Sequence, residues 1–310
     1  MKKRLIMLLV VAAGALALRA PAPAAVLAAA PSVAITFDDG PNVVKRGAEA
    51  TAENDAILAA LAAAKVKSAL FVAGKRVDSP EGLAAVTAWG RAGHIVGNHS
   101  YSHRSFGAAA MTLDEFETDV ARNEELIRKL PGFARLFRFP FLKEGDTAEK
   151  RDGLRAFLRR RHYRQGRPTI DASDWYYDDR FLAWRAAHPG GDAAAFRDAY
   201  LAHLWDRAQY YDQLSRRVAG RSVRHVLMLH TNAINAAFLP DVIHMFRARG
   251  WKVVDAARAF RDPIYEAQPR VLPAGESLIW SLAKEKGEGE LRYPAEDGVY
   301  EKPILDAAGL

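Results

Sequence analysis

Short apolar runs alternate along the chain with longer segments in which apolar residues recur at helical spacing. The short runs predict strands at residues 33–37, 68–72, 94–99, 136–139, 168–170, 223–229 and 251–254. The helical patterns lie at residues 54–64, 80–92, 112–130, 147–161, 240–249 and 278–283. Because strands and helices take turns, the pattern predicts an α/β fold with a parallel sheet and outer helices, either a barrel or an open doubly wound sheet.

Two segments depart from this alternation. Residues 178–220 are long for one connection and carry a stripe of apolar side chains at helical spacing, which predicts a helical insertion packed on the body rather than a cofactor groove. The stripe consists of Phe196, Tyr200, Leu204, Tyr211, Leu214 and Val218. Residues 260–310 are rich in Pro, Gly and charge, so we expect a C-terminal extension that wraps the surface.

The composition is that of a globular protein. The chain has 310 residues, of which 50% are hydrophobic and 26% charged, and it has no cysteine. These values exclude a disordered chain and a disulfide-stapled scaffold. One large core is the simplest interpretation, since α/β barrels run to about 250 residues as a single domain.

Residues 1–24 have the three parts of a secretory signal peptide: a basic start, an apolar run at 5–18 and Ala-Pro-Ala at 22–24. They carry four basic residues and no acid, so cleavage after Ala24 lowers the formal charge from +7 to +3 and removes the argument for a nucleic-acid partner. We therefore expect export to the periplasm or the medium, with no membrane span after cleavage. The alternative is a retained signal anchor, although the apolar run is shorter than the ~20 residues that cross a bilayer.

Polar side chains that can carry chemistry follow four of the predicted strands, where parallel α/β folds place their sites. They are Asp38 and Asp39, His99 and His103, Arg138, and His230. Two histidines four residues apart converge on one ion if their segment forms a helical turn. With Asp39 they would give three ligands and an open position, as in a catalytic zinc site. Each feature alone is weak evidence for a metal site. The sequence Asp-Asp-Gly-Pro is more often a turn, and a single pair of histidines at this spacing also arises by chance. Their joint placement at strand ends favours a metal.

Five motifs follow one another at these strand ends. They are Thr-Phe-Asp-Asp-Gly-Pro at 36–41, His-Ser-Tyr-Ser-His at 99–103, Arg-Phe-Pro-Phe at 138–141, Asp-Ala-Ser-Asp-Trp at 171–175 and Leu-Met-Leu-His at 227–230. In this order they resemble the motifs of the polysaccharide deacetylases, the NodB homology enzymes of carbohydrate esterase family 4. The resemblance implies a distorted (β/α) barrel with fewer than eight units. We expect the catalytic domain to span residues 25–259, including the insertion at 178–220, with 260–310 as the extension.

The resemblance also implies metal-dependent removal of N-acetyl groups from amino sugars. Asp39, His99 and His103 would bind a divalent metal, most often Zn²⁺, with Co²⁺ and Ni²⁺ as alternatives. An acetamide is a poor electrophile, so the reaction needs an ion that polarises its carbonyl and lowers the pKa of the attacking water.

Acid and base roles are implied for residues of the same motifs. Asp38 would be the general base, held in its ionised form by Arg138. His230 would be the general acid for the departing amine, with Asp174 stabilising its charged form. The backbone N–H of Phe141 would help to hold the oxyanion, a contribution of ~2.7–4 kcal/mol for one such donor.

Aromatic residues beside the motifs are candidates for stacking on sugar rings, although packing at the core or rim explains them equally well. Trp175 and Tyr101 are the two that we expect to bind substrate. The sequence thus predicts an exported hydrolase that removes N-acetyl groups from an acetylated glycan of the chitooligosaccharide or peptidoglycan type. An O-deacetylase such as an acetylxylan esterase is the alternative enzyme, and a catalytically silent carbohydrate-binding protein of the same fold is the alternative from another class.

Overall fold

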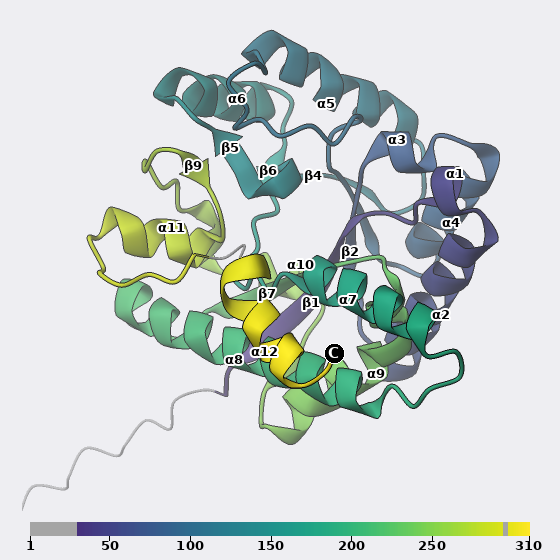
Figure 1. Ribbon diagram of the computed structural model, residues 1–310. Coiled ribbons are helices and arrows are strands. Elements are labelled where there is room, and N and C mark those ends of the chain that lie inside the picture. The colour runs from purple at the N-terminus through teal and green to yellow at the C-terminus, as the bar shows by residue number, and fades with distance from the viewer. Residues whose placement is uncertain (1–29, 294–296) are drawn as a thin grey trace, which may run out of the picture.

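A parallel sheet forms the centre of the molecule (Figure 1). The computed structural model describes residues 30–293 and 297–310, so the predicted signal peptide lies outside the described residues. The strands are β1 (Ser32–Asp39), β2 (Ala69–Val72), β3 (Ile95–Asn98), β4 (Phe133–Phe137), β6 (Arg164–Gln165), β7 (Arg224–His230) and β8 (Lys252–Val253). Their order is β6-β4-β3-β2-β1-β7, with β8 beside β1, and every pairing is parallel.

Helices surround this sheet (Figure 1). They are α1 (Val43–Arg46), α2 (Ala48–Ala64), α3 (Gly74–Val77), α4 (Pro80–Arg91), α5 (Leu113–Ile127), α6 (Ala148–Arg160), α7 (Asp174–Ala187), α8 (Ala194–Ala219), α9 (Ala233–Ala248), α10 (Ala256–Ala259), α11 (Leu278–Glu285) and α12 (Lys302–Ala307). Residues 164–170 link the two edges of the sheet, because β6 pairs with β4 and Ile170 forms a bridge to Leu227 of β7. The predicted distorted (β/α) barrel is therefore confirmed.

Strand β1 positions two carboxylates in the protein interior. Val33, Ile35 and Phe37 belong to one apolar cluster, whereas Ala34 belongs to a second, so the strand is covered on both faces. A strand buried in this way has a nearly continuous apolar sequence, which is the pattern seen at 33–37. Residues 33–39 are all buried, and the strand ends with its two carboxylates inside the protein.

The predicted helical insertion consists of α7 and α8. Their apolar side chains pack in the main core, which confirms a packing role for the stripe. The buried stripe residues are Phe196, Tyr200, Leu204, Tyr211, Leu214 and Val218. Helix α7 begins at Asp174, directly inside the fourth motif, so the insertion is continuous with the candidate site.

Several predicted elements have other bounds in the structure: α2 begins at Ala48 and not at residue 54, and β4 covers Phe133–Phe137 and not 136–139. Two further differences lie close to the candidate site. The helix expected at 240–249 begins at Ala233 and holds Pro240 in its interior. Its start is set by Asn232, whose side chain accepts a hydrogen bond from the Asn235 N–H, a typical N-cap. The strand expected at 168–170 is reduced to the bridge at Ile170, because regular pairing in this segment lies earlier, in β6.

The C-terminal extension is part of the core, not only a surface wrap. Helix α11 buries Leu278, Ile279 and Ala283, and Leu305 of α12 is fully buried. A short antiparallel pair joins the extension to the body through β5 (Lys143–Gly145) and β9 (Ala274–Gly275). Among the described residues, no helix is long and apolar enough to cross a membrane.

Candidate active site

Three side chains from two neighbouring strand ends meet in a small cluster. Asp39 ends β1, and His99 and His103 lie in the loop after β3; one ligand atom from each lies within 4.8 Å of the others. His103 Nε2 is 2.9 Å from Asp39 Oδ1, and His99 Nε2 is 3.8 Å from the same oxygen. Asp39 and His99 are buried, while His103 is partly exposed. The structure thus brings the three predicted ligands together.

The protonation pattern of this cluster fits a bound cation. His99 Nδ1 lies 2.8 Å from the Arg138 carbonyl oxygen, so Nδ1 carries the proton and Nε2 presents a lone pair. Burial lowers the pKa of His99 well below its usual value, which keeps the ring neutral. Asp39 Oδ1 is buried against the ring nitrogen of His103, while Arg76 holds Oδ2 at 2.9 Å. Nitrogen and carboxylate lone pairs facing one another are the donor set that zinc prefers.

The histidines do not converge through the expected helical turn. Residues 99–103 form an irregular loop in which Ser100 and His103 adopt positive φ angles of 62° and 55°. Asp119 of α5 holds this loop by accepting hydrogen bonds from the Ser102 N–H and hydroxyl. Local turn geometry and a carboxylate on a distant helix therefore replace helical spacing in bringing the rings together.

Asp38 lies between the cluster and Arg138, with its Oδ2 3.7 Å from His99 Nε2 and its Oδ1 turned toward the guanidinium. Arg138 Nη1 donates to Asp38 Oδ1 at 2.5 Å, and both side chains are almost completely buried. The guanidinium also donates to Thr36 Oγ1 and to the Gly166 carbonyl, and it lies 3.9 Å from the centre of the Phe71 ring. The predicted pairing of Asp38 with Arg138 is present, and the arginine is held rigidly.

Two opposing effects act on the ionisation of Asp38. Burial raises the pKa of Asp38 above its usual value, and this effect outweighs the opposing field of Arg138. The sequence predicts the effect of Arg138 but does not show the depth of burial. A carboxylate with a raised pKa is a stronger proton acceptor, which agrees with the predicted base role.

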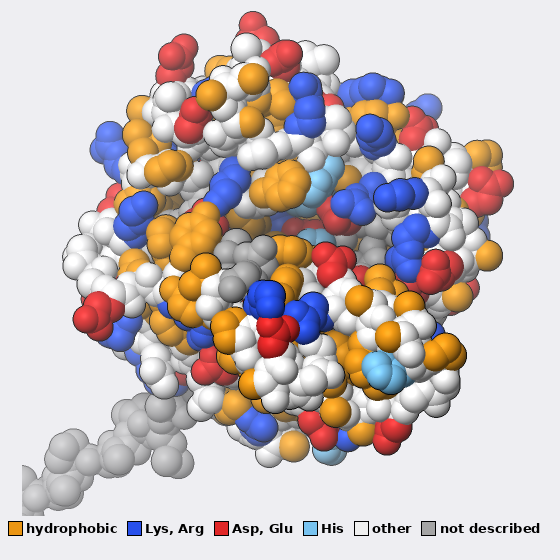
Figure 2. All heavy atoms as spheres, viewed as in Figure 1, with side chains coloured by type: hydrophobic (Ala, Val, Ile, Leu, Met, Phe, Trp, Pro, Cys, Tyr) orange, Lys and Arg blue, Asp and Glu red, His pale blue; other side chains and the backbone are white. Residues whose placement is uncertain are grey.

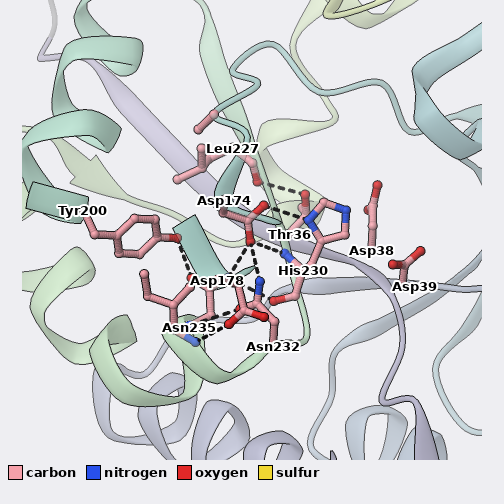
Figure 3. Close-up of polar contacts among 12 residues, drawn as sticks. Thr36, Asp38, Asp39, Asp174, Asp178, Tyr200, Leu227, His230, Asn232 and Asn235 are labelled. Atoms are coloured by element: carbon pink, nitrogen blue, oxygen red, sulfur yellow. Dashed lines mark hydrogen bonds and ion pairs between the residues drawn. The ribbon is translucent and has the colours of Figure 1, made fainter. Parts of the chain in front are cut away.

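His230 lies across the cavity from Asp39 and is held by Asp174 (Figure 3). His230 Nδ1 donates to Asp174 Oδ1 at 2.7 Å, which leaves Nε2 directed toward the cavity. Burial alone would lower the pKa of His230, but Asp174 raises it to about 10. The ring is therefore able to carry a proton at neutral pH, as a general acid must.

Asp174 is surrounded by donors that the sequence analysis missed. Its Oδ2 accepts hydrogen bonds from the His230 N–H at 2.8 Å, from Asn235 Nδ2 at 2.7 Å and from Asn232 Nδ2 at 3.2 Å (Figure 3). Tyr200 donates to Asn235 Oδ1 at 2.7 Å from the insertion. The N-cap signal at Asn232 was present in the sequence, but nothing local pointed from Asn235 or Tyr200 to Asp174.

The loop before Asp174 is tied to the C-terminal extension. His203 of α8 has Nε2 against the Ala172 carbonyl, and its Nδ1 lies 3.0 Å from Glu301 Oε2. Tyr177 donates to the same Glu301 oxygen at 3.0 Å. The acid side of the site therefore depends on contacts with both the insertion and the extension.

A cavity of about 630 Å³ opens above these groups. Figure 2 shows this face hollowed, with acidic and histidine side chains at its floor. Trp175 and Phe141 line the cavity and are 37% and 58% exposed, and the Phe141 ring centre lies 4.7 Å from that of His103. Tyr101 is not among the lining residues; it donates to Asp78 at 2.7 Å and lies beneath Arg122.

Comparison with known proteins agrees with this geometry. Residues 27–156 match the family model of the polysaccharide deacetylases. The match covers less than half of the chain, so it is this part of the chain that resembles the polysaccharide deacetylases. A curated relative, the peptidoglycan-N-acetylglucosamine deacetylase of Bacillus cereus, is 33% identical over 108 residues. That match covers 35% of this chain and 35% of the relative, so the chain spans about a third of the curated relative's length.

Solved structures share the fold. A carbohydrate esterase family 4 pseudoenzyme from Bacillus anthracis has a TM-score of 0.53 at 18% identity, covering 74% of this chain and 66% of that one. A mutant of that pseudoenzyme with restored enzymatic activity has a TM-score of 0.51 at 19% identity, covering 74% and 68%. At such identities the likeness concerns the fold, and it agrees with the barrel described above.

Proposed function

We propose that this protein is an exported hydrolase of the polysaccharide deacetylase family that uses a divalent metal, zinc, to remove N-acetyl groups from amino-sugar glycans. The observation that carries the proposal is the cluster of Asp39, His99 and His103, in which three lone-pair donors face one another beside a general base and opposite a general acid. Asp38 and His230 supply those two functions from neighbouring strands of the sheet.

Each residue of the candidate site has a separate role in the proposed amide hydrolysis. A bound ion would supply Lewis acidity for the acetyl carbonyl and a lower pKa for the attacking water. As Asp38 takes a proton from that water, the water oxygen forms a bond to the acetyl carbon and the carbonyl oxygen becomes an oxyanion. Arg138 holds Asp38 Oδ1 during this step. The Phe141 N–H donates to the oxyanion, His230 Nε2 delivers a proton to the departing nitrogen, and the C–N bond breaks to give acetate and a free amine.

Four further observations support the proposed substrate and location. The curated relative acts on N-acetylglucosamine of peptidoglycan, as its name states, and the cavity falls in the ~300–1,000 Å³ range of small-ligand sites. Exposed Trp175 and Phe141 offer apolar surfaces to a sugar ring. Residues 1–24 carry the pattern of a signal peptide, and an exported enzyme would meet such glycans in the periplasm or outside the cell.

Two alternatives use the same fold. An O-deacetylase would need the same base, acid and metal ligands, so it differs only in the substrate. A silent carbohydrate-binding protein is a real alternative, because a pseudoenzyme is among the structural relatives. The presence of both the paired base Asp38–Arg138 and the oriented acid His230–Asp174 supports turnover in this chain.

Acetate release tests the proposal. Purified protein is incubated with N-acetyl chito-oligosaccharides and, in parallel, with acetylated xylan, before and after chelation and again after zinc is restored. Release from the chito-oligosaccharides that chelation removes and zinc restores is the expected result. Release from xylan alone would favour the O-deacetylase, and tight sugar binding without acetate release would favour the silent protein.

A further inference from the structure

The C-terminal extension borders the cavity of the candidate active site. Strand β9 pairs with β5 immediately after the motif at 138–141, and the Glu276 N–H donates to the Leu142 carbonyl at 2.9 Å. Figure 1 shows β9 and α11 beside β5 at one side of the barrel. Glu276 and Tyr293 of the extension line the cavity together with Lys143 of the body. Nothing in the catalytic assignment above uses these three side chains.

These three residues form one hydrogen-bonded unit, which we call the Lys143 cluster. Lys143 Nζ donates to the Tyr293 hydroxyl at 2.6 Å and contacts Glu276 Oε1. The Tyr293 hydroxyl donates in turn to Glu276 Oε1 at 2.9 Å. Burial alone would lower the pKa of Lys143, but Glu276 raises it, so the ammonium stays charged. The cluster thus presents both donor and acceptor atoms at the edge of the cavity.

The Tyr293 ring is fixed but accessible. Trp280 of α11 is buried, and its Nε1–H donates to the Arg292 carbonyl at 2.9 Å, which anchors the backbone next to Tyr293. The two rings meet edge to face, with centres 5.9 Å apart and planes at 89°. Tyr293 nevertheless remains 43% exposed. A tyrosine held in this way offers an apolar face at little cost in conformational entropy.

The Lys143 cluster stands between two cavities. Lys143, Glu276 and Tyr293 line the main cavity of about 630 Å³, and the same three residues line a neighbouring cavity of about 320 Å³. Trp280 and Pro273 line the second cavity but not the first. The Lys143 cluster is therefore the shared wall of the main cavity and of a second cavity that the extension lines.

We propose that the Lys143 cluster binds a second sugar ring of the same glycan, next to the ring that loses its acetyl group. This inference rests on the proposed function and names its substrate class, an acetylated glycan of at least two sugars. A pyranose ring has an apolar C–H face that packs on an aromatic ring, and hydroxyls that suit an ammonium donor and a carboxylate acceptor. The Tyr293 ring supplies the first surface, and Lys143 and Glu276 supply the polar partners.

Binding to the metal-free protein tests the inference directly. The dissociation constants of N-acetylglucosamine and of its β-1,4-linked tetramer are measured by calorimetry for wild type, Tyr293→Ala and Tyr293→Phe. Tyr293→Ala removes the ring and weakens binding of the tetramer about tenfold. The reason is that the variant loses the contact of one aromatic ring with the sugar and the apolar area buried by that contact. Tyr293→Phe keeps the ring and stays within about threefold of wild type. Tyr300→Ala removes an exposed tyrosine of the extension that lines neither cavity, and it leaves binding unchanged.

Kinetics separate this subsite from a general loss of structure. With metal added, Tyr293→Ala raises the KM for the tetramer and leaves kcat and the hydrolysis of 4-nitrophenyl acetate, which has no sugar, at wild-type values. Equal losses on the ester and the tetramer, or unchanged tetramer binding, would overturn the inference.

The outcomes also separate the two proposals. A wild-type protein that releases no acetate, yet binds the tetramer in a Tyr293-dependent manner, refutes the deacetylase and supports the subsite. Acetate release from the tetramer that is indifferent to Tyr293→Ala supports the deacetylase and refutes the subsite. A wild-type protein that neither binds nor deacetylates the tetramer refutes both.

Discussion

The two sides of the candidate active-site cavity are built on opposite principles. On one side, Asp39, His99 and His103 bring one possible ligand atom each within 4.8 Å of the others. On the other side, Asp174 accepts hydrogen bonds at both oxygens, and its partners lie in β7, in α9 and at the N-cap of α9. The first arrangement is one that a cation would stabilise, whereas the second is complete within the chain itself.

This difference has an energetic meaning. Buried polar atoms without a partner cost about 1–3 kcal/mol each, so a cation bound between facing lone pairs would stabilise this side of the site. A satisfied network has the opposite property, because removing one member leaves the others unpaired. Substitutions on the metal side should therefore change ion content first, and substitutions on the acid side should change orientation and pKa.

The largest effect is expected when the metal side is broken. His99→Ala removes one of three ligands, so zinc content and acetate release both fall to background, a loss beyond the roughly 10²–10⁴-fold contribution of a general base. Elemental analysis after dialysis measures the ion, and added zinc should raise the melting temperature of wild type but not of the variant. His244→Ala, an exposed histidine on α9, is the control and keeps full zinc. Full zinc occupancy in His99→Ala would refute the ligand set.

The second-largest effect is expected at Asp38, the proposed general base, which lies between the two sides of the cavity. Asp38→Asn keeps the shape of the side chain but cannot accept the proton, so kcat falls by about a thousandfold while bound zinc stays near wild type. Arg138 also loses its charged partner in the interior, which lowers the free energy of unfolding by up to about 3–5 kcal/mol. Steady-state kinetics, elemental analysis and urea unfolding measure the three quantities. Retention of most of kcat would remove Asp38 from the base role.

On the acid side, the main expected change is in the pH profile. Asp174 raises the pKa of His230 to about 10, and the general acid works only below its pKa, while it is protonated. Asp174→Asn lowers that pKa, so the alkaline limb of kcat moves to lower pH, and kcat at neutral pH falls by about a hundredfold. A pH series on one substrate measures the limb. The control Asp179→Asn alters a neighbouring exposed carboxylate of α7 and should leave the alkaline limb of kcat in place. An unshifted limb in Asp174→Asn would exclude Asp174 as the residue that raises the pKa of His230.

The same two sides differ in how far the sequence predicts them. Asp38, Asp39, Arg138 and His230 all follow apolar runs, and the ends of parallel strands meet at one edge of a sheet, so local pattern was enough to bring them together. The β/α alternation predicted a parallel sheet with outer helices for the same reason, and the resemblance of the five motifs implied the barrel. What local pattern could not give was the shape of the loop at 99–103, which depends on Asp119 and on two positive φ angles.

The support of the acid side comes from long-range packing. Tyr200 lies in the insertion and Glu301 in the extension, and each acts on the Asp174 region across a large sequence separation. The apolar stripe that includes Tyr200 predicted a core helix, and the charged segment that includes Glu301 predicted a surface extension. Neither pattern indicated a contact with the Asp174 region, because nothing in the neighbouring residues encodes that tertiary contact. The raised pKa of Asp38 was missed for a related reason, since depth of burial is a property of the assembled core.

The smallest effect is expected at the outer layer of the acid side, where Tyr200 donates to Asn235 and Asn235 donates to Asp174 (Figure 3). Tyr200→Phe removes one buried hydroxyl and leaves Asn235 Oδ1 short of a donor, so the free energy of unfolding falls by about 1 kcal/mol. If the network transmits the loss of this hydrogen bond to His230, kcat falls by no more than about fivefold, because 1 kcal/mol corresponds to about that factor. The zinc content is unchanged. Urea unfolding and kinetics test both values beside Tyr300→Phe, an exposed tyrosine. A loss of zinc in Tyr200→Phe would show that the two sides are one coupled unit, against the separation argued here.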